Sequence, residues 1–559
     1  MNRSPSAVTG REGVILVVVA FVLAAYFTWP LALRPGSIGR VQMGDGQFSI
    51  WNVSWVAHAL VTPGVAVYDA NIFHPHRGTL AYSEPNLGAG VLGVPAYLLT
   101  RNPYAAHNTA VLISLTMTVV GMYLLARRLT SSPEASLIAA IVFAFCPFFF
   151  ARTSHIQLMM TAPLPFTLLA LHRFVDSVTV GRALALGLAI GVQALFCAYY
   201  GVLIGLITGL GLLVFSVARG YWRQPRWWGL CLLAAAVSVL IVLPFFLPFI
   251  NLQEDTGFQR ELQEASSYSA DWRSYFASSA SAHDWMLRFL GRWREVLFPG
   301  FTALILGMCG IVFSLRSGTS MARKSAGWGA GTTSFYLFML VMTVWASLGP
   351  AAGLYSVLYQ TVPVFSLLRA PARFGIAVTL ALAVFVALAA STLLGRLAPR
   401  GRRWATAGLL VFVVVELSTE IPYIPARDVP RAYKVLAAAD PGPVAEFPFY
   451  HQPQDRFRHS LYMIGSTAHW LPLLNGYSDY TPPDFIEGGA LLEKFPNPEG
   501  LAWLRARATR YVVFHLGLYG DDDERRLLER IEAHAADLKP KFVHGSVLLY
   551  EITPVNGTP

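Results

Sequence analysis

The stretch VILVVVAFVLAAYFTWPLAL, residues 14–33, decides the fold class of this chain. It is apolar over about 20 residues, the length that an α-helix needs to cross the hydrocarbon core of a bilayer. Arg3 and Arg11 precede it, as in a signal peptide, but no convincing small-residue cleavage site follows, so we expect a retained first membrane helix. Further apolar segments of comparable length follow near residues 105–126, 135–151, 158–172, 184–198, 201–218, 228–250, 297–315, 333–349, 373–395 and 404–420.

The composition is that of a membrane protein. Of the 559 residues, 55% are hydrophobic and only 13% are charged, whereas soluble domains carry roughly 25% charged residues. The sequence therefore predicts a polytopic α-helical membrane protein with about 11 transmembrane helices. A net charge of +10 would suggest nucleic acid as the partner of a soluble protein. In a membrane protein the location of the charge matters more than its sum, so we expect no nucleic-acid partner.

Arginine and lysine placement orients the helices. Basic residues fall in every second loop, from Arg127 and Arg128 to the group at 396–403, and the positive-inside rule makes these loops cytoplasmic. The apolar segment 87–100 is short, and counting it as a span would place Arg127 and Arg128 outside. We therefore expect it to be a re-entrant or interfacial helix. The Ala-, Gly- and Arg-rich composition is compatible with a bacterial inner membrane.

The opposite, extracytoplasmic face collects the long loops. We expect residues 1–420 to form the transmembrane core, with extracytoplasmic loops at about 34–104 and 251–296. Residues 421–559 differ in character, because charge runs appear and strand-like pieces alternate with helix-like ones. These pieces are 444–448, 500–507, 511–514, 522–536 and 547–552. The alternation predicts a small soluble, extracytoplasmic α/β domain.

A short acidic motif, MGDGQ at residues 43–47, lies just beyond the first helix. Desolvating a carboxylate where a hydrophobic helix meets water costs free energy, so a functional role would explain the presence of Asp45 at this position. Asp45 could take the proton of a sugar hydroxyl that attacks an anomeric carbon, and its flanking glycines would let a substrate approach closely. The alternative is a turn-forming Asp-Gly that only solvates the helix end. Glu84, in the same loop, could supply a second acid or be an exposed loop acid.

Two arginines lie in the motif LRAPARF, residues 368–374, on the extracytoplasmic side of the predicted topology. Pro371 interrupts the helix start, so Arg369 and Arg373 can both project from a turn toward the membrane surface. Guanidinium groups bind phosphate oxygens bidentately and stay charged at any relevant pH. The positive-inside rule disfavours arginine on this face, which favours phosphate binding as the reason for the pair.

Other polar groups lie in the remaining outer loops. Arg152 and His155 occupy a very short turn, where they could reach a phosphate or an acceptor, or anchor the protein at the interface. Tyr199-Tyr200, in the next outer turn, is interpreted as an aromatic-belt pair. Asn475 and Tyr477 belong to the segment NGYSDY, whose aromatic and amide groups suit sugar binding, although a tight turn with buried tyrosines would use the same residues.

Taken together, the acidic first loop, the long helical core and the soluble C-terminal domain resemble the GT-C superfamily of membrane glycosyltransferases. GDGQ at 44–47 looks like the acidic signature of its first loop, and LRAPARF looks like an arginine motif of the YfhO-like branch. The resemblance implies a polyprenyl-phosphate-linked sugar donor, inversion at the anomeric centre, Asp45 as base, and Arg369 or Arg373 on the departing phosphate. Many members carry adjacent acids where this chain has glycine after Asp45. Either Glu84 supplies the second acid or the site works with Asp45 alone. Binding of a divalent cation, Mg or Mn, is therefore possible but not required by the motif.

The sequence thus predicts a glycosyltransferase that moves a sugar from a polyprenyl-phosphate-linked donor to a glycan, lipid or protein acceptor at the outer face of the membrane. A transporter or flippase of a lipid-linked saccharide is the alternative, and a degenerate scaffold for envelope assembly is a third possibility. A transporter should carry ionisable residues or broken helices within its spans, in corresponding halves of the chain. Here the spans are nearly free of charge and the polar groups cluster on one face, which favours an enzyme.

Overall fold

The computed structural model describes residues 9–39, 43–152, 154–257, 260–316 and 328–554. The chain divides into two compact units. The first comprises Met1–Leu33, Val111–Leu247 and Gly257–Pro422, and the second comprises Arg34–Ala110, Pro248–Thr256 and Tyr423–Pro559. The second unit therefore combines the first long loop with the C-terminal segment.

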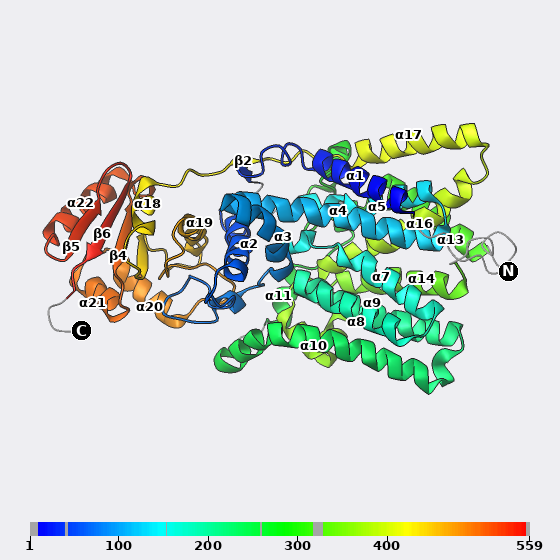
Figure 1. The fold of residues 1–559 in the computed structure, drawn as a ribbon, viewed down its shortest axis with the longest axis horizontal. Helices are drawn as coiled ribbons and strands as arrows, with labels where there is room; N and C mark the ends of the chain where they lie inside the picture. The colour runs from blue at the N-terminus through cyan, green and yellow to red at the C-terminus, as the bar shows by residue number, and fades with distance from the viewer. Residues whose placement is uncertain (1–8, 40–42, 153, 258–259, 317–327, 555–559) are drawn as a thin grey trace. The chain divides into compact units, whose positions relative to one another are not determined.

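The first unit contains helices and no strand among its described residues (Figure 1). Its helices are α1 (Gly10–Phe27), α5 (Pro133–Ala144), α6 (Pro147–Ala151), α7 (Pro163–Asp176), α8 (Val180–Phe196), α9 (Ala198–Ala218), α11 (Leu262–Ser267), α12 (Asp284–Leu290), α13 (Phe301–Arg316), α14 (Ala330–Ser347), α15 (Leu354–Thr361), α16 (Gly375–Leu394) and α17 (Pro399–Leu417). Helices α4 (Pro103–Thr130) and α10 (Pro225–Thr256) are divided between the two units.

Each of the eleven predicted apolar segments contains helix in the structure, and the prediction of a polytopic α-helical membrane protein is confirmed. Among the described residues, 7 helices are long and apolar enough to cross a membrane: Gly10–Phe27, Pro103–Thr130, Pro133–Ala151, Ala198–Ala218, Pro225–Thr256, Ala330–Ser347 and Pro371–Leu394. Helices α8 and α13 are apolar but shorter. The first helix ends at Phe27 rather than at residue 33, because the backbone turns over the segment that contains Pro30.

Helix α16 is the centre of the first unit. Nearly all of its residues are buried, and α5, α13 and α14 pack against it. Gly310 of α13 lies so close to α16 that a Cβ atom there would be 2.1 Å from the carbonyl oxygen of Phe385. Small residues of this kind let two membrane helices approach through their backbones, where dispersion contacts hold them together.

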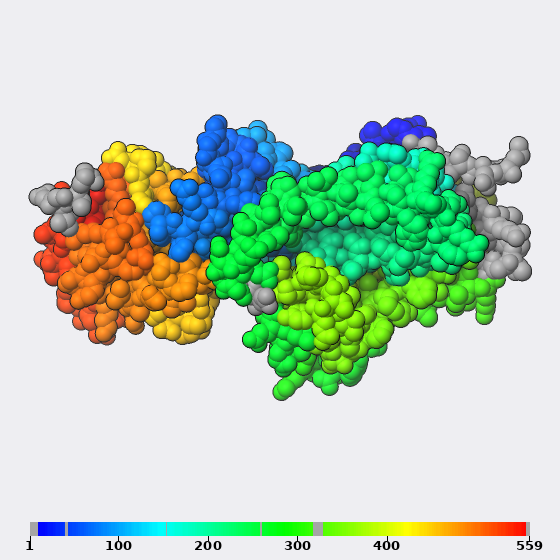
Figure 2. Space-filling model, turned by 90° about the horizontal axis from the view of Figure 1, so that it is seen from below, coloured from blue at the N-terminus to red at the C-terminus, as the bar shows by residue number. Residues whose placement is uncertain are grey.

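A second group of helices completes the first unit. Helices α7, α8 and α9 pack on one another, and α9 also packs on α14 (Figure 1). The part of α10 that belongs to this unit lies along the face seen in Figure 2. Its apolar side chains, such as Leu232 and Leu240, are exposed. An apolar helix face of this length that no other described element covers suits contact with lipid.

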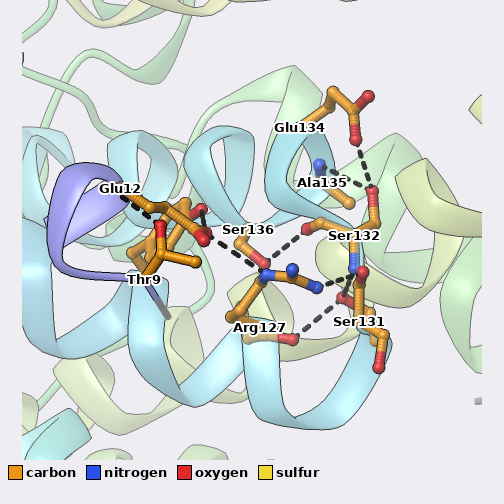
Figure 3. A network of polar contacts seen from close by, with 11 residues as sticks. Thr9, Glu12, Arg127, Ser131, Ser132, Glu134, Ala135 and Ser136 are labelled. Atoms are coloured by element: carbon orange, nitrogen blue, oxygen red, sulfur yellow. Dashed lines mark hydrogen bonds and ion pairs between the residues drawn. The ribbon is translucent and has the colours of Figure 1, made fainter. Parts of the chain in front are cut away.

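One end of the first unit carries a polar network around Glu12 (Figure 3). Tyr123 donates a hydrogen bond of 2.7 Å to the Glu12 carboxylate, and Arg127 forms an ion pair of 3.4 Å with it. Thr9 caps the same helix by accepting the backbone N–H of Glu12 at 3.2 Å. This network joins α1 to α4.

The second unit contains a mixed four-stranded sheet in the order β3-β4-β6-β5. Its strands are β3 (Val444–Phe447), β4 (Tyr511–His515), β5 (Leu538–Phe542) and β6 (Val547–Ile552). Only β3 and β4 are parallel. Helix α18 (Arg431–Ala437) packs on the sheet through Tyr433 and Leu436. The predicted α/β character of the C-terminal segment is confirmed, whereas the domain boundary at residue 421 stays a prediction.

The first long loop folds with this sheet domain. It forms β1 (Ile38–Gly39), α2 (Asp45–Val61) and α3 (Leu87–Thr100), and β1 pairs with β2 (Ile424–Pro425). Helix α2 packs on α3 and on α19 (Ser460–Ser466). The remaining helices of the unit are α20 (Pro483–Leu492), α21 (Pro498–Ala506) and α22 (Asp521–Ala533). The segment 87–100 is helical, as predicted, and its re-entrant or interfacial position stays a prediction.

Candidate functional site

Asp45 is the first residue of α2, and the backbone of Gly44 before it has a φ of 90°, which favours glycine. The Gly44 N–H donates to Ser460 Oγ at 2.9 Å, which holds the helix start against α19. Tyr477 donates its hydroxyl to Asp45 Oδ1 at 2.6 Å. The positive end of the helix dipole also favours a carboxylate in the first turn. Asp45 is exposed, so a substrate can reach a carboxylate whose orientation is set by Tyr477.

The loop that carries Tyr477 is held from several sides. Gly476 lies against the ring of Phe73, where a Cβ atom would be 2.6 Å from ring carbons. Phe48 of α2 meets the Tyr477 ring edge-on, with centroids 6.1 Å apart. Asn475 is fully buried, and its side chain pairs with the backbone of Glu446 at 2.7 and 2.9 Å. The predicted sugar contact of Asn475 stays a prediction, and its contacts anchor the loop to β3.

Glu84 lies in the same unit as Asp45. Asn52, two turns further along α2 than Asp45 and so about 10 Å from it along the axis, donates to the Glu84 carbonyl oxygen at 3.2 Å. The neighbouring Ser83 donates to Asp479 Oδ2 at 3.0 Å. The segment of Glu84 is therefore tied both to α2 and to the loop of Tyr477. Asp479 was not singled out from the sequence, because it stands among turn-forming residues.

The two predicted arginines lie in the first unit: Arg369 precedes the short 3-10 helix η9 (Pro371–Phe374), and Arg373 belongs to it. Arg369 pairs with Glu264 at 3.4 Å, and its guanidinium lies 5.4 Å from the ring centroid of Tyr268. Arg373 lies 5.2 Å from the ring centroid of Tyr199. In the described part of the chain no carboxylate forms an ion pair with Arg373. Among the described residues, this cation is therefore held by an aromatic ring rather than by a carboxylate.

Arg152 follows α6 directly and forms an ion pair with Glu295, which is buried. Burial, and then the positive charge of Arg373, lower the pKa of the Arg152 guanidinium from its ordinary value. The two guanidinium groups are therefore electrostatic neighbours. The backbone N–H of His155 donates to the Arg152 carbonyl at 3.1 Å, which keeps both residues in one turn. The first unit thus gathers Arg152, His155 and Arg373.

Several residues that contact these arginines could not be recognised as their neighbours from the sequence. The aromatic-belt interpretation of Tyr199 and Tyr200 is wrong, because both side chains are buried. Tyr199 donates to the Ala370 carbonyl at 2.6 Å and supports Arg373, and Tyr200 donates to the Leu158 carbonyl at 3.1 Å. Glu264 and Glu295 come from the second long loop, where no periodicity separates them from its other acids.

A resident divalent cation would need several oxygen ligands around one position. Mg and Mn prefer several carboxylate oxygens around one ion. In the described ranges, no group of three or more His, Cys, Asp or Glu residues could hold a metal ion. The described residues therefore do not fit a resident Mg or Mn ion.

The fold and these two clusters define a polytopic membrane protein with an attached α/β domain. Residues 92–424, more than half of the chain, match a family model described as "6-pyruvoyl-tetrahydropterin synthase related domain; membrane protein". The chain belongs to this family of membrane proteins. No curated protein matches the sequence.

Solved structures of low identity resemble the chain. The apo oligosaccharyltransferase of Archaeoglobus fulgidus is 13% identical, covers 91% of this chain and 70% of its own, and has a TM-score of 0.49. The same organism's AglB, in complex with an inhibitory peptide and a dolichol-phosphate, is 13% identical over 97% and 75%, with a TM-score of 0.44. ArnT from Cupriavidus metallidurans, bound to undecaprenyl phosphate, is 13% identical over 99% and 100%, with a TM-score of 0.42.

Proposed function

We propose that this protein is a GT-C-type glycosyltransferase, of the YfhO-like branch, which moves a sugar from a polyprenyl-phosphate-linked donor to a glycan, lipid or protein acceptor. The hydrogen bond from Tyr477 to Asp45 carries this proposal. It joins two residues that the sequence suggested separately for sugar chemistry, and it orients an exposed carboxylate at a helix start. The reaction takes place at the outer face of a bacterial inner membrane, where the C-terminal segment is also located.

The reaction is a single displacement. The Asp45 carboxylate removes the proton of an acceptor hydroxyl while its oxygen attacks the anomeric carbon of the donor. The bond from that carbon to the phosphate oxygen breaks, and the lipid phosphate leaves with the electron pair. Because attack comes from the side opposite the phosphate, the anomeric centre is inverted. Tyr477 holds one carboxylate oxygen in place, and Glu84 binds the acceptor hydroxyls.

The departing lipid phosphate is stabilised by arginine side chains. Negative charge grows on the phosphate in the transition state, so fixed cations near it lower the barrier. Arg373 is the first candidate, because its guanidinium is held by Tyr199 and has no ion-pair partner among the described residues. Arg369 and Arg152 have carboxylate partners. They bind the phosphate once those ion pairs rearrange, and His155 assists in the same turn.

The proposal is tested by sugar transfer in proteoliposomes that contain radiolabelled polyprenyl-phosphate sugars. Asp45→Asn keeps an acceptor oxygen for Tyr477 but removes the base, so we expect label release to fall by about 100-fold or more. Asp521→Asn, an exposed acid at the start of α22, is the matched control and should leave release unchanged. Release that survives in Asp45→Asn would remove this residue from the reaction. Protein-dependent movement of the intact lipid without release would instead establish a transporter.

A further inference from the structure

A cavity of about 560 Å³ lies within the second unit, away from Asp45. Its wall comes from the start of α4, from the linker that precedes α18, from α19, and from the end of β4. Neither Asp45 nor Tyr477 lines it. Its volume falls within the range of about 300–1,000 Å³ that is usual for small-ligand sites.

A histidine–carboxylate pair lies at the wall of this cavity. His515 lines the cavity, and its Nε2 is 2.6 Å from Glu446 Oε2. Tyr433, which also lines the cavity, donates its hydroxyl to the same oxygen. Tyr462 stacks on the imidazole with ring centroids 5.0 Å apart and an interplanar angle of 22°, which sets the plane of the ring.

Glu446 is an unusual residue to find in this position. It is 0% exposed, and its Oε1 has no hydrogen-bond partner among the described residues. A buried carboxylate with an unsatisfied oxygen is costly, so a core strand would be more stable with an apolar residue here. The carboxylate does have a clear effect on His515. It accepts hydrogen bonds only, so His515 Nε2 is the donor between the two, and the tautomer that this contact selects has Nδ1 as an acceptor.

The rest of the wall suits a polyhydroxylated ligand. Tyr104 and Tyr433 supply aromatic surface, and Thr467 and Ser546 supply hydroxyl groups. Arg427 and Asp428 are exposed and also line the cavity, and neither forms an ion pair within the described residues. Charges of both signs fit a neutral ligand with many donors and acceptors better than an anion. Aromatic faces with such mixed polar groups are the combination that sugars require.

We propose that this cavity binds one or two sugar units of a glycan acceptor, with His515 Nδ1 accepting a hydrogen bond from a sugar hydroxyl. The inference rests on the proposed function in one respect, because it selects a glycan among the possible acceptors. The binding itself does not require transfer. Glu446 acts as a positioning residue, since it sets the tautomer of the imidazole.

Three variants test binding in the cavity separately from the stability of the fold. Gly517 lines the cavity, and a Cβ atom there would have no atom within 4 Å, so Gly517→Phe fills the cavity without a clash at the backbone. Gly520→Phe is the matched control, because Gly520 is equally open but does not line the cavity. His515→Gln keeps a donor for Glu446 and removes the ring nitrogen Nδ1.

The test uses the full chain in fluorescent nanodiscs on an array of defined oligosaccharides of hexoses, pentoses and N-acetylhexosamines. We expect wild type and Gly520→Phe to bind a related set of glycans and Gly517→Phe to bind none. His515→Gln should lower affinity about tenfold, the loss of one hydrogen bond. Retained binding in Gly517→Phe, or no glycan bound by wild type, would overturn the inference.

The same array distinguishes the two proposals. Asp45→Asn should bind the same glycans as wild type while releasing no sugar from the lipid donor. If glycans bind but wild type never releases sugar, the cavity is a glycan site and the proposed function fails. If wild type transfers sugar but binds no glycan on the array, the proposed function stands and this inference fails.

Discussion

Arg369 and Arg373 stand on opposite sides of Pro371, and the surroundings of their guanidinium groups differ. Arg369 has a carboxylate partner in Glu264. Arg373 has Tyr199, whose ring lies 5.2 Å away, and no ion pair with a described residue. Cation–π contact positions a guanidinium without neutralising it, whereas a carboxylate neutralises it. The residue spacing is symmetric in the sequence, but the electrostatic environment is not.

This difference predicts unequal effects of removing the two side chains. Arg373→Ala should lower kcat/KM for the lipid donor by about 100-fold, the loss of a charge-assisted phosphate contact. Arg369→Ala should cost about tenfold, because its charge is already partly balanced. Steady-state transfer in proteoliposomes measures both, with Arg525→Ala on α22 as the control. Equal losses in Arg369→Ala and Arg373→Ala would contradict this assignment.

The helices follow directly from the apolar segments of the sequence, whereas several other elements do not. Strand β5 was missed because its sequence, LKPKF, contains lysines and a proline. It is an edge strand with only Leu538 buried, and edge strands tolerate such residues. Asp45 and Arg373 could be proposed as site residues because a charge beside a membrane helix is unusual. The contacts of Tyr199 and Glu295 with this cluster could not be predicted, because their partners lie far away in the chain.

The close packing of α13 on α16 requires a residue without a side chain at position 310. Gly310→Val would place a methyl-bearing Cβ against the Phe385 carbonyl, where the structure leaves 2.1 Å. We expect a loss of about 1–3 kcal/mol in the free energy of unfolding, since overpacking forces the helices apart. Gly229→Val on α10 is the control, because no atom lies within 4 Å of its Cβ position. Detergent unfolding curves measure the difference, and similar curves for both variants would show that α13 moves freely.

At the scale of the whole molecule, the second unit draws its core from two distant parts of the chain. Trp470 stacks on His58 of α2, with centroids 4.6 Å apart, and donates to the Tyr97 hydroxyl at 3.1 Å. Asn71 donates to Ser466 Oγ at 3.1 Å. A separate domain of residues 421–559, as expected from composition, would not need these contacts. The structure instead predicts that the first loop and the C-terminal segment unfold together.

Hydrogen–deuterium exchange on the full chain in nanodiscs can decide between these alternatives. Trp470→Ala removes the indole that joins α2 and α3 to the C-terminal segment, so exchange should increase in residues 50–61 and 87–97 as well as around α19. Trp503→Ala is the control, since that indole packs on Gly488 and Arg507 within the C-terminal segment. Its effect should be confined to α20 and α21. If Trp470→Ala increased exchange only beyond residue 421, the first loop and the sheet domain would be independent folding units, and Asp45 would have to be positioned without the support of Tyr477.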